Sequence, residues 1–106
     1  MDVSVYLDGY HGDNCKSILV GRKDIIVGID SINELTARAN ALMEATETAL
    51  MEAIAVCHAG VQVSEIGRVM HDIADANGFR SMKNICGGGV GSHLHMLPEI
   101  KVSLEI

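Results

Sequence analysis

Residues 2–21, DVSVYLDGYHGDNCKSILVG, decide the fold of this chain because they read as two strands joined by a tight turn. The first strand alternates polar and apolar side chains from residue 2 to residue 7, which is the period of a half-buried strand. Asp8 and Gly9 are the favoured pair for a two-residue type I′ turn, because both central positions of that turn need φ > 0. The sequence therefore predicts an antiparallel hairpin.

This hairpin has one polar and one apolar face, because facing residues share a side and side chains alternate along each strand. The polar face carries Asp2, Ser4, Tyr6, His11, Asp13 and Cys15, and the other carries Val3, Val5, Leu7, Gly12 and Asn14. Asp2 and Asp13 are diagonal neighbours, with Cβ atoms roughly 7 Å apart. Two carboxylates that close repel each other unless cations lie between them, and a pair of divalent ions is the usual occupant. The alternative is an ordinary solvated face, since antiparallel sheets commonly expose one side to water.

Length and composition limit the number of domains, the kind of core and the possible partners. At 106 residues we expect one domain at most, over residues 1–106, with room for one modest core. Only three residues are aromatic (Tyr6, Tyr10 and Phe79), so the expected core is aliphatic and filled by methionine. The net charge of −6, without any basic run, argues against nucleic acid and anionic membranes as partners.

The cysteines and the N-terminus indicate where the protein resides. No apolar stretch is long enough for a membrane span, and the N-terminus lacks a signal-peptide pattern. Cys15, Cys57 and Cys86 are odd in number and widely spaced, without a CxxC pair. Such cysteines fit a reduced chain better than a disulfide framework, so we expect a cytoplasmic protein.

A first helix is expected in the middle of the chain. Ser31 and Glu34 form a capping box, and apolar residues then recur at helical spacing as far as about Cys57 or His58. Gly60 is the expected C-terminal cap. The apolar positions are Ile32, Leu35, Ala39, Leu42, Ala49, Leu50, Ala53, Ile54 and Cys57.

A second helix is predicted to begin at Ser64 as N-cap and to stop at Gly78. Its apolar stripe consists of Ile66, Val69, Met70, Ile73 and Ala74. Residues 79–86, FRSMKNIC, are predicted to form a strand after this helix. The segment Ile25–Val27, before the first helix, reads equally as a short strand or as a buried connection.

The second informative stretch is CGGGVGSHLHMLPEI, residues 86–100. Its glycines allow a ligand to approach the backbone closely, as in a phosphate-binding loop. However, the stretch lacks the Lys-Ser/Thr of a P-loop, and no predicted helix follows it. His93 and His95 would share a face of a strand and could pair on a metal, although such a pair is also ordinary polar surface.

These segments, in this order, resemble type I methionine aminopeptidases. The resemblance rests on DVSVYLDGYHGD, LVG, SEIG, ANGF and CGGGVGSHLHMLPEI, and covers residues 2–21 and about 42–100. It implies an α/β (α+β) fold, a partial pita-bread fold in which an antiparallel hairpin and at least one further strand are covered by two helices. It also implies two divalent metal ions (Co, Mn, Fe or Zn) and a peptide with an N-terminal methionine as substrate. Enzymes of this family remove the initiator methionine from nascent proteins.

The resemblance also implies roles for individual residues. Asp2 and Asp13 match the two aspartates that bridge the metals, the same pair that the predicted hairpin brings together. His95 matches a histidine that contacts the scissile region of the substrate. His93 matches no ligand of the family, so we interpret it as surface.

Several departures from the family pattern bear on activity. Gly88 stands where the family has a metal-binding histidine, and Leu94 stands where it usually has an aromatic residue of the methionine pocket. The chain begins at the first metal aspartate and ends before two further glutamate ligands would be expected. Glu105, within VSLEI, is either one of these ligands after a shortened loop or a chance match. Residues 22–41 are longer than the corresponding connection of the family.

We therefore expect a chain related to an aminopeptidase that, alone, is a weak metal binder or inert. An alternative is a non-catalytic truncated or designed fragment that acts as an interaction module. Its incomplete sheet leaves an unpaired strand edge, which favours a homo-oligomer. A third possibility, ranked last, is an anion-binding protein that uses the glycine-rich stretch.

Overall fold

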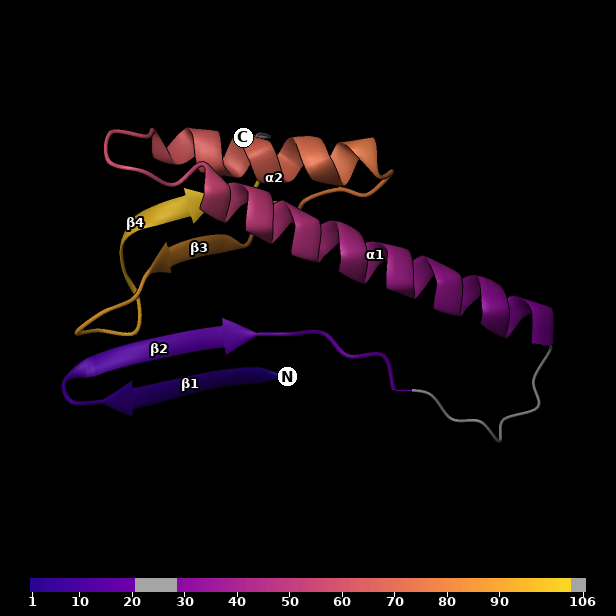
Figure 1. Cartoon of the computed structure of the whole chain (residues 1–106), viewed down its shortest axis with the longest axis horizontal. Coiled ribbons are helices and arrows are strands. Elements are labelled where there is room, and N and C mark those ends of the chain that lie inside the picture. Colours follow the sequence, from indigo (N-terminus) through magenta and orange to yellow (C-terminus); the bar gives the residue numbers. More distant parts are fainter. Residues whose placement is uncertain (21–28, 104–106) are drawn as a thin grey trace.

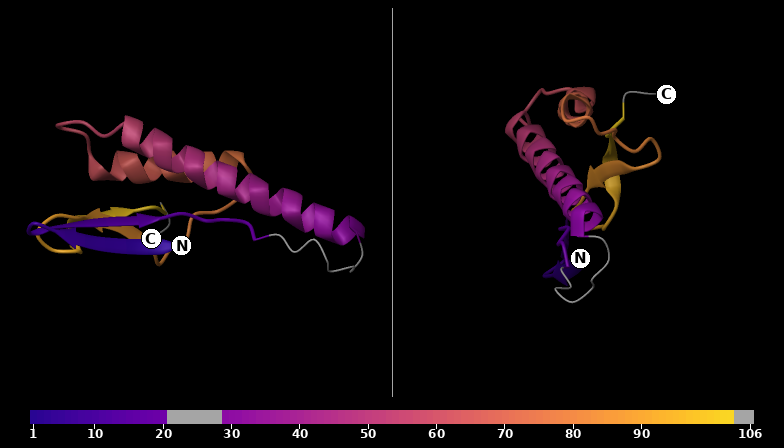
Figure 2. Two further views of the ribbon diagram at one scale, coloured as in Figure 1. Left: turned by 60° about the horizontal axis from the view of Figure 1, so that its bottom comes forward. Right: turned by 90° about the vertical axis from the view of Figure 1, so that its right-hand side faces the viewer.

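The computed structural model describes residues 1–20 and 29–103. Its elements are β1 (Asp2–Leu7), β2 (Tyr10–Cys15), α1 (Ile29–Ala55), α2 (Val63–Ala76), β3 (Cys86–Gly89) and β4 (Met96–Lys101). The strands form two separate antiparallel pairs, β1–β2 and β3–β4. Both helices lie on the same side of the strands (Figures 1 and 2), which confirms the predicted α+β fold class.

The hairpin β1–β2 has the predicted register. Asp2 pairs with Cys15 and Leu7 with Tyr10, and the turn residues Asp8 and Gly9 have φ of 50° and 92°. Positive φ at both positions is the requirement of a type I′ turn. The prediction is therefore confirmed, including the face that each side chain occupies.

Helix α1 differs from its prediction at both ends. It begins at Ile29, so Ser31 lies inside the helix and is not its N-cap. It ends at Ala55, because the Cys57 N–H donates to the Ile54 carbonyl at 3.0 Å and thereby tightens the last turn. Gly60, the predicted cap, has φ of +92° but lies beyond the end of the helix. The segment Ile25–Val27 lies outside the described residues.

Helix α2 begins at Val63, and its N-cap is Gln62, whose side chain makes no capping hydrogen bond. The prediction of Ser64 as the cap is therefore wrong, and the Gln62 carbonyl instead accepts the Glu65 N–H at 2.9 Å. The predicted end is confirmed, since Asn77 is the C-cap and Gly78 follows with φ of +72°.

The strand predicted at residues 79–86 is wrong, because the structure forms the strand β3 at Cys86–Gly89, within the glycine-rich stretch. Gly88 pairs with Glu99 of β4, and a register shift follows between Gly88 and Gly89. A Cβ on Gly89 would lie only 2.8 Å from the Leu97 carbonyl oxygen. Glycine is thus needed where the two backbones approach each other, which a pattern of apolar alternation does not reveal.

The helices meet through small side chains. Ala45 and Ala53 of α1 and Ile66 of α2 are the buried hydrophobic residues of the described chain, and the remaining stripe of α2 is half-buried as predicted. In the predicted stripe of α1, the large side chains Leu35, Leu42, Leu50 and Ile54 are exposed. The alanines let the helix axes come close, so the contact between the helices is narrow.

The hydrophobic core is therefore thin. The radius of gyration is 16.8 Å, whereas a compact domain of this length has about 13 Å. The solvent-accessible surface is 8728 Å², against about 5,700 Å² for a folded monomer of this mass. No described helix is long and apolar enough to cross a membrane.

Candidate functional site

The polar face of the hairpin brings the two predicted metal ligands onto one surface. Asp2 and Asp13 project from the same side of β1–β2, since Asp13 pairs with Ser4 and Asp2 with Cys15. The Ser4 hydroxyl donates to Asp13 Oδ1 at 2.7 Å. Both carboxylates are exposed, so they are open to a cation from solvent.

His11 connects this face to the glycine-rich stretch. Its backbone N–H donates to the Gly91 carbonyl oxygen at 2.7 Å, and its ring Nδ1 lies 3.2 Å from the same oxygen. Because a carbonyl can only accept, Nδ1 carries the proton in this contact. The Tyr6 ring lies against His11, with 4.8 Å between centroids. Two segments 80 residues apart are thereby joined.

The sequence prediction placed His11 on the polar face but gave it no role. Its contact with Gly91 is long-range, and no spacing in the chain indicates it. The only available signal is its position directly opposite Tyr6 in the register.

His95 lines a cavity of about 410 Å³ together with residues of the paired strands β3 and β4. The cavity is lined by Cys86, Gly87, Gly88, His95, Met96, Leu97 and Glu99. His95 thus lines the same cavity as Gly88, the position where the resembled family carries a histidine, and as Glu99. Met96 and Leu97 make part of the wall apolar, as in many small-molecule sites.

His93 and His95 do not share a face of a strand as predicted. Residues 91–95 form bends before β4, where the Gly91 N–H donates to the His93 carbonyl oxygen at 3.1 Å. The His93 ring is exposed, with Nδ1 3.2 Å from the Ser92 hydroxyl, in agreement with its interpretation as surface. Glu105 lies outside the described residues.

The candidate ligands are of the chemical type that divalent cations bind, but among the described residues they are too few. Carboxylate oxygens are preferred ligands of hard divalent ions. Within residues 1–20 and 29–103, however, no group of three or more His, Cys, Asp or Glu side chains is placed to hold a metal. The described residues therefore do not complete a two-metal centre, and Gly88 contributes no side chain to one.

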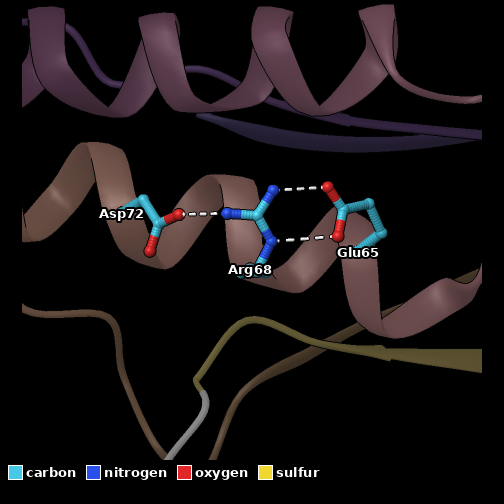
Figure 3. Close-up of polar contacts among 3 residues, drawn as sticks. All are labelled: Glu65, Arg68 and Asp72. Atoms are coloured by element: carbon cyan, nitrogen blue, oxygen red, sulfur yellow. Dashed lines mark hydrogen bonds and ion pairs between the residues drawn. The ribbon is translucent and has the colours of Figure 1, made fainter.

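A cluster of charged side chains lies away from these residues, on α2. Arg68 Nε donates to Glu65 Oε2 at 2.9 Å, and its terminal nitrogens donate to Glu65 and Asp72 (Figure 3). The hydrogen bonds from Arg68 lower the pKa of Glu65, and its positive charge lowers it further. All three side chains are exposed or half-buried at the surface, and their spacing along the helix makes this cluster a modest stabilising contribution to α2.

Comparison with known proteins identifies the family. The profile of metallopeptidase family M24 matches residues 1–104. Methionine aminopeptidase 1D, chloroplastic/mitochondrial, from Arabidopsis thaliana is 36% identical over 100 residues, which are 94% of this chain and 25% of that protein. The human mitochondrial methionine aminopeptidase 1D is 37% identical over 94% of this chain and 26% of its own length. This chain thus spans about a quarter of these relatives.

Solved structures of methionine aminopeptidases are similar to this chain in fold. The crystal structure of methionine aminopeptidase from Rickettsia prowazekii matches with a TM-score of 0.75 and 27% identity, over 96% of this chain and 36% of that one. The enzyme from Thermotoga maritima matches with a TM-score of 0.79 at 24% identity, which supports the fold alone. With homologues that are methionine aminopeptidases and a partial pita-bread fold, this chain belongs to metallopeptidase family M24, whose members use divalent metal ions.

Proposed function

We propose that this chain carries part of the site of a metal-dependent aminopeptidase that releases N-terminal methionine from peptides. The observation that carries this proposal is the contact of His11 with Gly91. It joins the hairpin that bears Asp2 and Asp13 to the segment that bears His95, so the two stretches most similar to the family lie together. Because the chain belongs to metallopeptidase family M24, we interpret these two neighbouring stretches as parts of one metallopeptidase site.

In this proposal each residue has a stated task. Asp2 and Asp13 hold a divalent ion (Co, Mn, Fe or Zn) with their exposed carboxylates, while Ser4 orients the Asp13 carboxylate by its hydrogen bond. A bound divalent ion polarises a carbonyl and lowers the pKa of a bound water. His95 donates a hydrogen bond to the substrate at its scissile region. Met96 and Leu97 offer apolar contacts to a methionine side chain.

A binding measurement tests the aspartates. Isothermal titration of the protein with Mn²⁺ should give heat that is strongly reduced in Asp13→Asn. Asp8→Asn is the matched control, since it makes the same chemical change in the turn of the same hairpin, where asparagine tolerates the φ of 50°. Equal heats for the wild type and Asp13→Asn would refute the assignment of Asp13 as a ligand.

By itself, the 106-residue chain should not release methionine from a Met-Ala-Ser peptide at a measurable rate. The described residues provide too few donors for an open two-metal site. A peptidase assay with added Co²⁺ or Mn²⁺ measures this directly. Metal-dependent turnover by the pure chain that is lost in Asp13→Ala would overturn the expectation of inactivity.

Three cysteines support a proposed cytoplasmic location. Cys15, Cys57 and Cys86 are all free and exposed. Exposed thiols persist in a reducing compartment and are oxidised outside it. Thiol titration of protein purified without reductant from the cytoplasm should find all of them free.

A second candidate function, self-association, is favoured by the exposed apolar surface. Val3, Val5 and Leu7 on the apolar face of the hairpin are 54%, 59% and 73% exposed. The surface beyond that of a compact monomer amounts to about 3,000 Å², whereas a stable dimer needs about 800 Å² from each partner. We propose that a second copy of the chain covers this face.

Light scattering after size exclusion tests this second proposal. At micromolar concentration we expect a mass above the 11.3 kDa of one chain. Val5→Lys should lower that mass, whereas Ser17→Lys, an equal charge change just beyond the hairpin, should not. A single peak at the mass of one chain would refute self-association and leave the aminopeptidase proposal untouched.

A further inference from the structure

A second cavity lies at the end of α2 and shares no residue with the cavity that His95 lines. Its volume is about 190 Å³, which is below the range of about 300–1,000 Å³ typical of sites for drug-sized ligands. We call it the α2 pocket, and its polar lining consists of His71, Asp75, Arg80, Ser81, Lys83 and Ser103. Its size and lining suit a small, polar ligand.

The lining comes from three segments that the fold brings together. The chain reverses at Gly78, with φ of +72°, and the Phe79 N–H donates to the Ala74 carbonyl oxygen at 2.9 Å. Residues 79–83 therefore turn back at the end of α2 (Figure 1). Ser103 follows β4, which packs on α2. The backbone thus forms the pocket before a ligand binds.

The pair of His71 and Ser81 retains a proton donor for such a ligand. His71 Nδ1 lies 3.2 Å from the Ser81 hydroxyl oxygen, and both residues are half-buried. If the hydroxyl donates to Nδ1, the neutral ring carries its proton on Nε2. If Nδ1 donates to the hydroxyl oxygen, the hydroxyl proton remains unused. In either tautomer this contact leaves one N–H or O–H to donate elsewhere.

Positively charged side chains outnumber carboxylates in the lining. Arg80 and Lys83 are cationic, and Asp75 is the carboxylate of the lining. Within residues 1–20 and 29–103, the Arg80 guanidinium takes part in no ion pair or hydrogen bond. A guanidinium binds phosphate oxygens through two parallel N–H donors, in hydrogen bonds about twice as strong as neutral ones. Arg80 is therefore available to bind an anion.

We propose that the α2 pocket binds phosphate, either as the free inorganic ion or as the phosphoryl group of a small molecule. Arg80 is the principal ligand, and the pair of His71 and Ser81 donates a further hydrogen bond. A tetrahedral anion presents oxygens in several directions, which suits donors that come from different segments. The charge of Asp75 opposes the anion and lowers its affinity. This inference is independent of the metal-binding and peptidase roles proposed above.

Nuclear magnetic resonance of the isotope-labelled chain tests this site. Inorganic phosphate is added in exchange for chloride at constant ionic strength, and the backbone amide shifts are followed. We expect saturable shifts at His71, Asp75 and residues 79–83. Arg80→Gln should raise the Kd for phosphate about tenfold, as expected for loss of a charge-assisted hydrogen bond. Arg38→Gln is the matched control, because it makes the same change at an exposed position of α1 outside the pocket.

A second variant has an effect of the opposite sign. Asp75→Asn removes the carboxylate charge with little change in shape and should lower the Kd for phosphate about two- to fivefold. Asp8→Asn, the same change in the hairpin turn, should leave it unchanged. Titration with glycerol phosphate distinguishes the two sources of the ligand. Binding at least as tight as that of inorganic phosphate assigns a phosphoryl group, and weaker binding assigns the free ion.

Three results would overturn the proposal. The first is shifts that do not saturate or that spread evenly over the chain, since these indicate nonspecific screening. The second is equal phosphate binding by Arg80→Gln and Arg38→Gln. The third is weaker binding by Asp75→Asn than by the wild type. Arg80 and Asp75 are both exposed, so these variants should otherwise keep the spectrum of the wild type.

Discussion

Substitution of Gly67 by alanine tests how the helices are attached to the strands. Gly67 lies in α2 and is buried against the end of β4. A Cβ at this position would fall within 3.0 Å of the Lys101 carbonyl oxygen and 3.2 Å from its carbonyl carbon. Because the obstacle is backbone and not a flexible side chain, either the helix or the strand has to move.

Helix propensity alone would make Gly67→Ala more stable than the wild type, whereas the clash with the Lys101 backbone would make it less stable. In a free helix, replacing glycine by alanine stabilises by about 0.5–1 kcal/mol. Overpacking costs about 1–3 kcal/mol, and a clash with backbone lies at the upper end of this range. The net expectation is a loss of about 2 kcal/mol in the free energy of unfolding, which lowers Tm by about 8–16 °C for a chain of this length.

Thermal and urea unfolding, followed by circular dichroism, measure this loss. Gly87→Ala is the control, because its Cβ would meet Ile100 Cβ at an ordinary 3.6 Å. A Gly67→Ala protein that is as stable as the wild type, or more stable, would show that α2 does not pack on β4 as described.

Three further predictions concern single residues. Gly9→Val should destabilise the hairpin by about 1 kcal/mol or more, measured by urea unfolding, because valine resists the φ of 92°. The depressed pKa of Glu65 stabilises the folded state at pH above its usual 4.5, and this contribution is lost as the pH falls through the lowered value. Arg68→Gln should therefore flatten the pH dependence of Tm below pH 4.5, and an unchanged profile would contradict the role of the cluster. His11→Gln should weaken the contact with Gly91, seen as faster amide exchange at His11, while Mn²⁺ binding changes less than in Asp13→Asn.

The hairpin was predictable in full because its determinants are local. The register follows from the alternation along β1 and from a turn pair that accepts positive φ. Because facing residues share a side of the sheet, the register also places Asp2 and Asp13 on the same face. The existence of both helices was likewise predictable from their periodicity. Their starts were not, because Ser31 and Ser64 are good caps that the chain passes over inside a helix.

The second strand pair escaped prediction for a different reason. Glycine disfavours strands in general, so Cys86–Gly89 reads as a loop and the preceding residues read as the strand. Only tertiary contacts resolve the ambiguity, since Gly89 fits where the Leu97 backbone comes close. The same limitation hid the role of His11, whose partner lies 80 residues away.

The β3–β4 ribbon is held at both ends by residues that sequence patterns do not single out. At one end Gly67 of α2 lies against Lys101, and at the other His11 of β2 binds Gly91. Gly88 and Glu99 pair between these two attachments. The position of the cavity relative to the hairpin therefore depends on both contacts. It follows that Gly67→Ala should disturb more than stability: a shift of the ribbon at Lys101 should also weaken the contact between His11 and Gly91, seen as faster amide exchange at His11. Unchanged amide exchange at His11 in Gly67→Ala would mean that the attachment to α2 has no influence on the other end of the ribbon.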